Sequence, residues 1–256
     1  MENKKNSTPL LLTGTIDSSV YNNTGNIIQN VAERLNQYES PIEKYISSTP
    51  FDIIVFIENS GYAFDELKYK KLAKIYGKEF EFIPGKICKD EILAHGKSFG
   101  DAYLIAEALE KSSLLANVEF FYKISGRIYL KNAKSILRTK NKYRNEFIMY
   151  QGKKWCFTNI FKANKEDYLS VLNDVYLDCD EISVNDIEIS FFNRLCTSDI
   201  SMGSFYTYPY FEGKMGATGE NYSGRLVERI IRNIMARLHF FTKDSLTSKL
   251  LAKIIH

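Results

Sequence analysis

The chain has 256 residues, with 34 Lys or Arg against 31 Asp or Glu, and it is 45% hydrophobic and 25% charged. This length suits one large domain, and the composition excludes a disordered or collagen-like chain. Its N-terminus, residues 1–9, is polar and is followed by only three leucines, which is far short of a signal-peptide core. No apolar run is long enough to span a bilayer, so we expect a cytoplasmic protein.

The cysteines are widely spaced and form no Cys-x-x-Cys pair. This spacing indicates reduced thiols and argues against a zinc site or a disulfide framework. The four are Cys88, Cys156, Cys179 and Cys196.

The first half of the sequence alternates between strand and helix patterns. Apolar residues recur at helical spacing from about Asn26, a candidate N-cap, and Pro41 is expected to start a second helical segment. A continuous apolar run such as 52–58 is typical of a strand covered on both faces, as in parallel sheets. This alternation predicts an α/β, Rossmann-like fold with a mostly parallel central sheet. The expected strands are 10–15, 52–58, 79–83 and 118–124, and the clearest expected helices are 65–76 and 98–115.

The second half is less regular. Segments 147–150 and 155–161 are expected to pair as a small hairpin around Gly152, and a helix is expected over 164–173. The chain ends in a segment with a helical pattern. We therefore divide it into a main domain, 1–222, and a helical tail, 223–256.

Polar residues follow three of the expected parallel strands. Ligands of open parallel sheets bind at the carboxyl ends of the strands, where loops and helix N-termini gather. Each set also has a purely structural explanation, as a turn, a cap or a solvated charge, but all three would meet at one edge of the sheet. They are Thr13, Gly14 and Thr15, then Glu58 and Asn59, then Ser125, Gly126 and Arg127.

A Gly-Lys-Ser sequence precedes the helix expected over 98–115. A phosphate-binding P-loop would need a glycine five residues before the Gly-Lys pair, and Glu91 occupies that position. Lys97 and Ser98 remain candidates for binding a phosphate or a ribose at a helix N-terminus, with an ordinary capped helix as the alternative.

Two acidic clusters could carry chemistry. Asp178 and Asp180 form an Asp-x-Asp pattern, and paired carboxylates suit a divalent metal ion. Asp186 and Glu188 open an expected helix and are candidates for a general base that deprotonates an acceptor hydroxyl. The structural alternative for the second pair is helix capping.

The tail is basic. Residues 223–256 contain seven Lys or Arg against two acidic residues, a charge of +5 in a chain whose net charge is +3. Apolar residues recur between the charges, as in an amphipathic helix that lies on an anionic membrane. Packing of this helix on the body is an alternative, and nucleic-acid binding is not expected because the rest of the chain is near neutral. The apolar residues are Leu226, Ile230, Ile234, Leu238 and Phe241.

Several of these segments together resemble small bacterial GT-A-like glycosyltransferases of lipopolysaccharide O-antigen and capsule synthesis, including galactosyltransferase-like members. The resemblance covers about the first two-thirds of the chain. It implies that residues 1–222 form a nucleotide-sugar-binding and catalytic domain. It also implies a nucleotide-sugar donor, a lipid-linked or glycan acceptor, and a cytoplasmic protein peripheral at the membrane. The segments are LLLTGT (10–15), RLNQY (34–38), FIENSGY (56–62), GKSFGDAYLIAEAL (96–109) and FYKISGRIYL (121–130).

The resemblance also assigns roles to residues. It implies that Thr13, Glu58 and Asn59 hold the nucleoside and that Lys97 and Asp101 line the donor pocket.

Lys123, Ser125 and Arg127 stand about where GT-A enzymes place their metal-binding Asp-x-Asp. This departure leaves a Mn²⁺ or Mg²⁺ requirement open and predicts no tightly bound cofactor, because Arg127 and Lys123 could neutralise the leaving diphosphate. The expected function is transfer of a sugar, with a UDP-hexose favoured as donor. Alternatives are a CMP-sugar-dependent transferase and a non-catalytic nucleotide- or phosphosugar-binding regulator.

Overall fold

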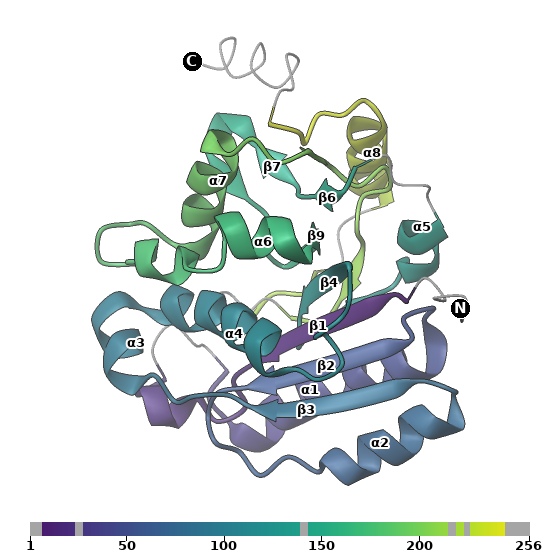
Figure 1. Cartoon of the computed structure of the whole chain (residues 1–256), viewed down its shortest axis with the longest axis vertical. Helices are drawn as coiled ribbons and strands as arrows, with labels where there is room; N and C mark the ends of the chain where they lie inside the picture. The colour runs from purple at the N-terminus through teal and green to yellow at the C-terminus, as the bar shows by residue number, and fades with distance from the viewer. Residues whose placement is uncertain (1–6, 24–27, 139–142, 215–218, 223–225, 244–256) are drawn as a thin grey trace.

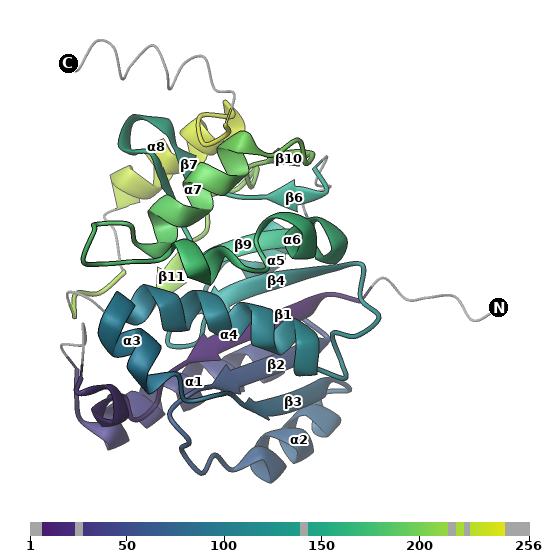
Figure 2. The ribbon, with the colours of Figure 1, turned by 60° about the vertical axis from the view of Figure 1, so that its left-hand side comes forward.

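A seven-stranded, mostly parallel sheet forms the centre of the molecule, as expected (Figures 1 and 2). The computed structural model describes residues 7–23, 28–138, 143–214, 219–222 and 226–243. The strand order is β10-β6-β9-β4-β1-β2-β3, and β9 runs antiparallel to its neighbours β4 and β6. The strands are β1 (Pro9–Gly14), β2 (Ile53–Glu58), β3 (Glu79–Pro84), β4 (Phe120–Ser125), β6 (Asn145–Glu146), β9 (Ile160–Asn164) and β10 (Met202–Gly203).

Helices cover both faces of this sheet, which explains why its central strands are apolar throughout. In β2, Ile54 and Phe56 pack into the core on the side of α1 (Val31–Ser48) and α2 (Glu66–Ile75). Val55 and Ile57 pack into the core on the side of α4 (Lys97–Lys111). Helices α6 (Lys165–Val171) and α7 (Ile187–Thr197) lie on the same face as α4 (Figure 2).

Helix α1 differs from the expectation in one respect. It is continuous through Pro41, which was expected to begin a separate segment. Proline inside a helix removes one backbone hydrogen bond, but the buried side chains of Ile42, Tyr45 and Ile46 hold the following turns against the sheet. The helix is capped by Asn30, whose side chain accepts from Glu33 N; the expected cap, Asn26, lies outside the described residues.

The other helices of the first half are close to their expected ranges. Asp65 caps α2, as its predicted start implies. A short helix that was not expected, α3 (Lys89–His95), precedes α4, and Gly96 separates the two with a φ of 91°, a backbone conformation that favours glycine. Helix α4 also ends at Lys111, earlier than expected.

The second half is built from short elements. The expected hairpin is confirmed, because β7 (Met149–Tyr150) pairs with β8 (Trp155–Cys156). The expected second strand, 155–161, is nevertheless split, and its end belongs to β9 in the central sheet. This half also contains β5 (Tyr129–Leu130), α5 (Ala133–Arg138) and β11 (Phe211–Glu212).

The described part of the tail contains helix α8 (Leu226–Arg237), which packs on the body. Phe241, just after the helix, is buried in the core, and Met149 N donates to its carbonyl oxygen at 2.9 Å. The apolar stripe of the helix faces outward, with exposed fractions of 51–66%. No helix in the described ranges is long and apolar enough to cross a membrane. The outward residues are Leu226, Val227, Ile230, Ile231, Ile234 and Leu238.

Candidate active site

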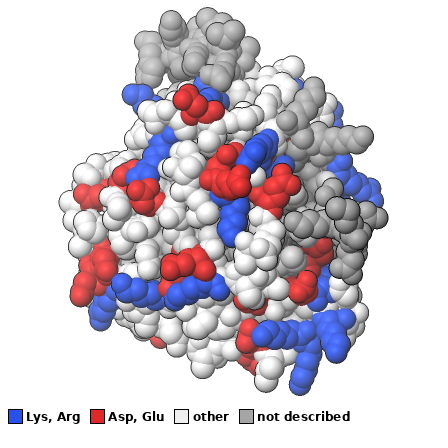
Figure 3. Space-filling view, in the orientation of Figure 1, with Lys and Arg blue, Asp and Glu red and all other residues white. Residues whose placement is uncertain are grey.

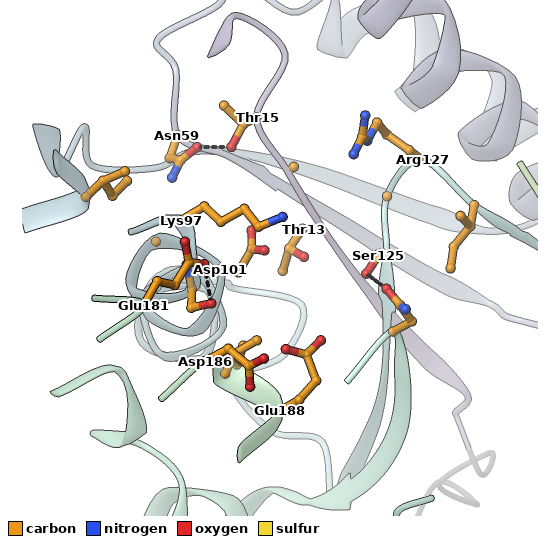
Figure 4. A pocket seen from close by; sticks show the side chains of 18 of the residues that line it. Thr13, Thr15, Asn59, Lys97, Asp101, Ser125, Arg127, Glu181, Asp186 and Glu188 are labelled. Carbon is orange, nitrogen blue, oxygen red and sulfur yellow. Dashed lines mark hydrogen bonds between the residues drawn. The ribbon is translucent and has the colours of Figure 1, made fainter. Parts of the chain in front are cut away.

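A cavity of about 940 Å³ lies at the carboxyl ends of β1, β2 and β4 (Figure 4). Its other walls come from α4, from the start of α7 and from the segment between β8 and β9. Most of the candidate residues line it, although the roles assigned to them stay predictions. They are Thr13, Gly14, Thr15, Asn59, Lys97, Ser98, Asp101, Ser125, Gly126, Arg127, Asp186 and Glu188.

Glu58 does not line the cavity. Its side chain is buried, and its carboxylate accepts hydrogen bonds from the backbone N–H groups of Ile16 at 2.7 Å and Ser60 at 2.9 Å. These bonds join the loops that follow β1 and β2. Glu58 therefore holds the loops after β1 and β2 in place and is not part of the cavity lining.

Lys123 is also absent from the lining, which overturns its expected contact with a leaving diphosphate. Its side chain is 3% exposed, and Nζ donates to the carbonyl oxygen of Thr158 at 3.1 Å. Burial lowers the pKa of this ammonium, while the nearby carboxylates of Asp101 and Glu188 raise it. Lys123 is a buried amino group near the acidic side of the cavity.

The Asp-x-Asp pair lies away from the cavity lining. The Asp178 carboxylate forms an ion pair with Arg194, and Asp180 accepts from Ile182 N at 3.1 Å and from Ser183 Oγ at 2.8 Å. Among the described residues, no group of three or more His, Cys, Asp or Glu is arranged to hold a metal ion. The residues present therefore do not fit a carboxylate-held divalent metal site, and no chemical step here is assigned to one.

The N-terminus of α4 is capped by a residue from a distant loop. Oε1 of Glu181 accepts from Ser98 N at 3.1 Å and from Ser98 Oγ at 2.6 Å, and both residues lie at the cavity wall. The Glu181 carboxylate thus accepts the hydrogen bonds of Ser98 that were expected to hold a phosphate. Lys97, which also lines the cavity, extends its ammonium toward Thr13 (Figure 4).

Asp186 and Glu188 lie together on the wall formed by α7 (Figure 4). Asp186 caps the helix, because its Oδ1 accepts from Ile189 N at 2.8 Å. Oε1 of Glu188 accepts from Thr158 Oγ1 at 2.9 Å. Burial, and after it the negative charge of Asp186, raises the pKa of Glu188 to about 7. Glu188 is therefore suited to exchange a proton near neutral pH, whereas Asp186 has a capping role.

Across the cavity, Ser125 ends β4 and Arg127 follows it. Ser125 Oγ donates to Asn159 Oδ1 at 2.9 Å, and Asn159 Nδ2 donates to Tyr222 Oη at 2.9 Å. The Arg127 guanidinium lies on the cavity wall and makes a long contact, 3.4 Å, from Nη1 to Gln37 Oε1. The bonds of Asn159 tie the end of β4 to segments of the second half, and the Arg127 contact reaches back to α1.

Close packing requires glycine at two positions near the strand ends, Gly14 and Gly126. Tyr38 Oη accepts from Thr15 N at 2.9 Å, and its ring lies against both turns. A Cβ at Gly14 would lie 2.5 Å from that ring, and one at Gly126 would lie 2.8 Å from Thr13 O. Glycine is therefore needed for this close approach, which no sequence motif signalled.

Other cavity residues were also missed from sequence. Glu181, Asn159 and Tyr222 sit in loops. Glu181 directly follows the Asp-x-Asp pattern, but that pattern indicated a metal site and not a helix cap. Asn159 could have been found from sequence, because it stands just before the apolar start of β9, where a polar residue marks the boundary of a strand.

No protein-family profile matches the sequence, and a search of curated proteins found no match. Among solved structures, the chain is similar to the glycosyltransferase GlyE of Streptococcus pneumoniae TIGR4, with a TM-score of 0.47 and 7% identity, covering 78% of this chain and 46% of that one. It thus spans less than half the length of that protein.

The chain is also similar to a 4-diphosphocytidyl-2C-methyl-D-erythritol synthase from Anaerococcus prevotii, with a TM-score of 0.45, 10% identity and coverage of 89% and 95%. The mannosyltransferase Ktr4p from S. cerevisiae has a TM-score of 0.42 and 9% identity, with coverage of 80% and 70%. These likenesses are distant.

Proposed function

We propose that the protein is a glycosyltransferase that moves a sugar, favoured to be a hexose of a UDP-sugar, to a hydroxyl of a lipid-linked or surface-glycan acceptor. The observation that carries the proposal is Glu188, whose pKa is raised to about 7 in a cavity that also contains Lys97 and Arg127. A base near neutral pKa and cations on facing walls are what transfer from a nucleoside diphosphate requires.

In the proposed reaction, Glu188 accepts the proton of the acceptor hydroxyl. The hydroxyl oxygen bonds to the anomeric carbon of the donor sugar, and the bond from that carbon to the diphosphate oxygen breaks. The electron pair leaves with the nucleoside diphosphate, whose growing negative charge Arg127 and Lys97 stabilise. A single base and direct displacement give inversion at the anomeric carbon, so a product that retained the configuration would contradict this step.

The donor is proposed to lie along the ends of β1 and β2. There Thr15 Oγ1 donates to Asn59 Oδ1 at 2.7 Å, which leaves the amide N–H₂ of Asn59 to donate to a nucleoside, and Thr13 lies beside them on the cavity wall. A CMP-sugar is the alternative donor. It presents one phosphate where a UDP-sugar presents two.

A donor screen tests the proposal. The purified protein is assayed with UDP- and CMP-sugars, with and without manganese, for thermal stabilisation, for donor hydrolysis and for transfer to lipid-diphosphate-linked and free glycan acceptors. Stabilisation together with transfer is the expected result. Stabilisation with no turnover on any acceptor supports the non-catalytic regulator instead.

The outward stripe of α8 supports a second part of the proposal, peripheral attachment to the cytoplasmic face of a membrane. Five large apolar side chains on α8, with Leu238 just after it, form the kind of patch that marks a contact surface. On the side facing the body, Arg229 and Arg232 lie over the rings of Tyr210 and Tyr208, with the Arg229 guanidinium 3.5 Å from the Tyr210 ring centroid. These contacts leave the apolar stripe outward, and an amphipathic helix that is also rich in basic residues favours anionic lipid.

Vesicle binding tests this attachment. We expect the protein to co-sediment with anionic vesicles and Ile230→Glu to reduce that binding, with Leu67→Glu on the exposed face of α2 as the matched control. On the face shown in Figure 3, acidic and basic residues are interspersed, which does not favour a nucleic-acid surface. Equal binding by Ile230→Glu, or preferential binding to oligonucleotides, would contradict the proposal.

A further inference from the structure

One wall of the cavity is aromatic. Trp155, Phe157 and Tyr222 all line it, and we call these three the aromatic wall. The ring centroids of Trp155 and Phe157 lie 5.8 Å apart, and buried Phe211 bridges Phe157 and Tyr222 at 6.1 and 5.7 Å. Trp155 and Phe157 are only half-buried, so they keep surface that a ligand can cover.

The aromatic wall lies next to Glu188. Thr158, which directly follows Phe157, donates the hydrogen bond to the Glu188 carboxylate. The charge of Glu188 also reaches both ends of the wall. After burial, it is the largest influence that raises the pKa of the Cys156 thiol, beside Trp155, and it contributes to raising that of Tyr222.

The opposite side of the cavity has a different character. Thr15 and Asn59, at the ends of β1 and β2, offer polar groups. The base of a transferase must lie beside the acceptor hydroxyl, and here the base adjoins the aromatic wall.

We propose that the aromatic wall is the acceptor subsite and that it stacks against the pyranose ring of the sugar that receives the transferred residue. This inference rests on the proposed glycosyltransferase function and names its acceptor chemistry. The C–H face of a pyranose ring is apolar and covers an aromatic ring, while its hydroxyls need polar partners at the edge of that ring. Asn159 and Glu188 provide such partners on the adjoining wall.

Trp155 is the only tryptophan of the chain, so its fluorescence reports on this wall without any substitution. The unmodified protein is titrated with methyl β-D-galactopyranoside and its glucose and N-acetylglucosamine counterparts, first alone and then with UDP, GDP or CMP present. We expect at least one glycoside to change the intensity or the wavelength of Trp155 emission in a saturable way.

Variants separate the sugar from the nucleotide. In Trp155→Ala we expect the acceptor KM, or the glycoside Kd where turnover is not yet found, to rise about tenfold or more, as for a buried aromatic anchor. Calorimetric nucleotide affinity should stay within about twofold, because a ΔΔG of that size is below what one lost contact produces. Tyr76→Ala, which removes a 49%-exposed aromatic ring after α2, is the control.

Two results would overturn the inference. One is a Trp155 emission that responds to no glycoside at millimolar concentration with nucleotide bound. The other is a Trp155→Ala variant that loses nucleotide affinity, which would assign the wall to the nucleobase. Failure of the transferase proposal itself is distinguishable, because it would appear as nucleotides that neither bind nor support turnover while the glycoside titration still gives its own answer.

Discussion

The two halves of the molecule contribute to the cavity in different ways. The first half supplies a regular frame, in which β1, β2 and β4 run parallel and end at one edge of the sheet. The second half supplies short elements and loops that hold Glu188, Asn159 and the aromatic wall. The comparison teaches that one side of the cavity is set by sheet topology, whereas the other side, to which we assign the base and the acceptor contacts, is set by individual side chains.

The largest expected effect concerns the base in the second half. Glu188→Gln keeps the shape and removes the proton acceptor, so we expect kcat to fall about 10²–10⁴-fold in a transfer assay. The same substitution should stabilise the fold at alkaline pH. Because the folded-state pKa of Glu188 is raised, its contribution favours the fold at low pH and is lost as pH rises toward about 7, so the variant should have a higher Tm than the wild type at pH 8.

Asp186→Asn is the control for this substitution. It keeps a side-chain oxygen that can cap α7 at Ile189 N and should retain most of the activity. If Asp186→Asn were as inactive as Glu188→Gln, the general base would have to be assigned to Asp186 instead.

The next effect concerns the first half. Arg127→Ala removes a cation from the end of β4, and we expect kcat to fall about 10²–10³-fold, because charge stabilisation on the leaving group is lost. Arg127→Lys should recover part of this loss. An unchanged kcat with a raised donor KM would assign Arg127 to ground-state binding only.

A smaller effect is expected at Lys123, beneath both halves. Lys123→Met removes a buried amino group and leaves the cavity lining intact, so we expect kcat at its optimal pH to fall less than about tenfold. Lys123 lies near Glu188, so loss of its amino group can move the step of the pH–rate profile only toward higher pH. A loss of kcat as large as that of Arg127→Ala would indicate that Lys123 does contact the diphosphate.

The frame was predictable from sequence for the same reason that it is regular. Strands buried on both faces read as unbroken apolar runs, and β1 and β2 were found within one or two residues. Parallel connections then place the residues after each strand at one edge, which is why Thr13, Asn59 and Ser125 could be grouped.

The other side could be predicted only in part. Glu188 was identified because it opens a helix, but its raised pKa depends on burial that no local pattern encodes. Glu58 and Lys123 were misplaced because position along a strand does not tell whether a charged side chain faces the cavity or is satisfied beneath it. The outward stripe of α8 was recognised as periodic, but the contacts of Arg229 and Arg232 with tyrosine rings decide which side faces the body.

The most direct test of the account is the pH dependence of kcat/KM for sugar transfer by the wild-type protein. If Glu188 is the general base, the unprotonated form is active, and kcat/KM should rise with pH through an apparent pKa of about 7 and then level off. The residual activity of Glu188→Gln should lose this step. A step near 7 that persists in Glu188→Gln, or a wild-type profile that is flat from pH 5 to 8, would contradict the assignment of the base and with it the proposed mechanism.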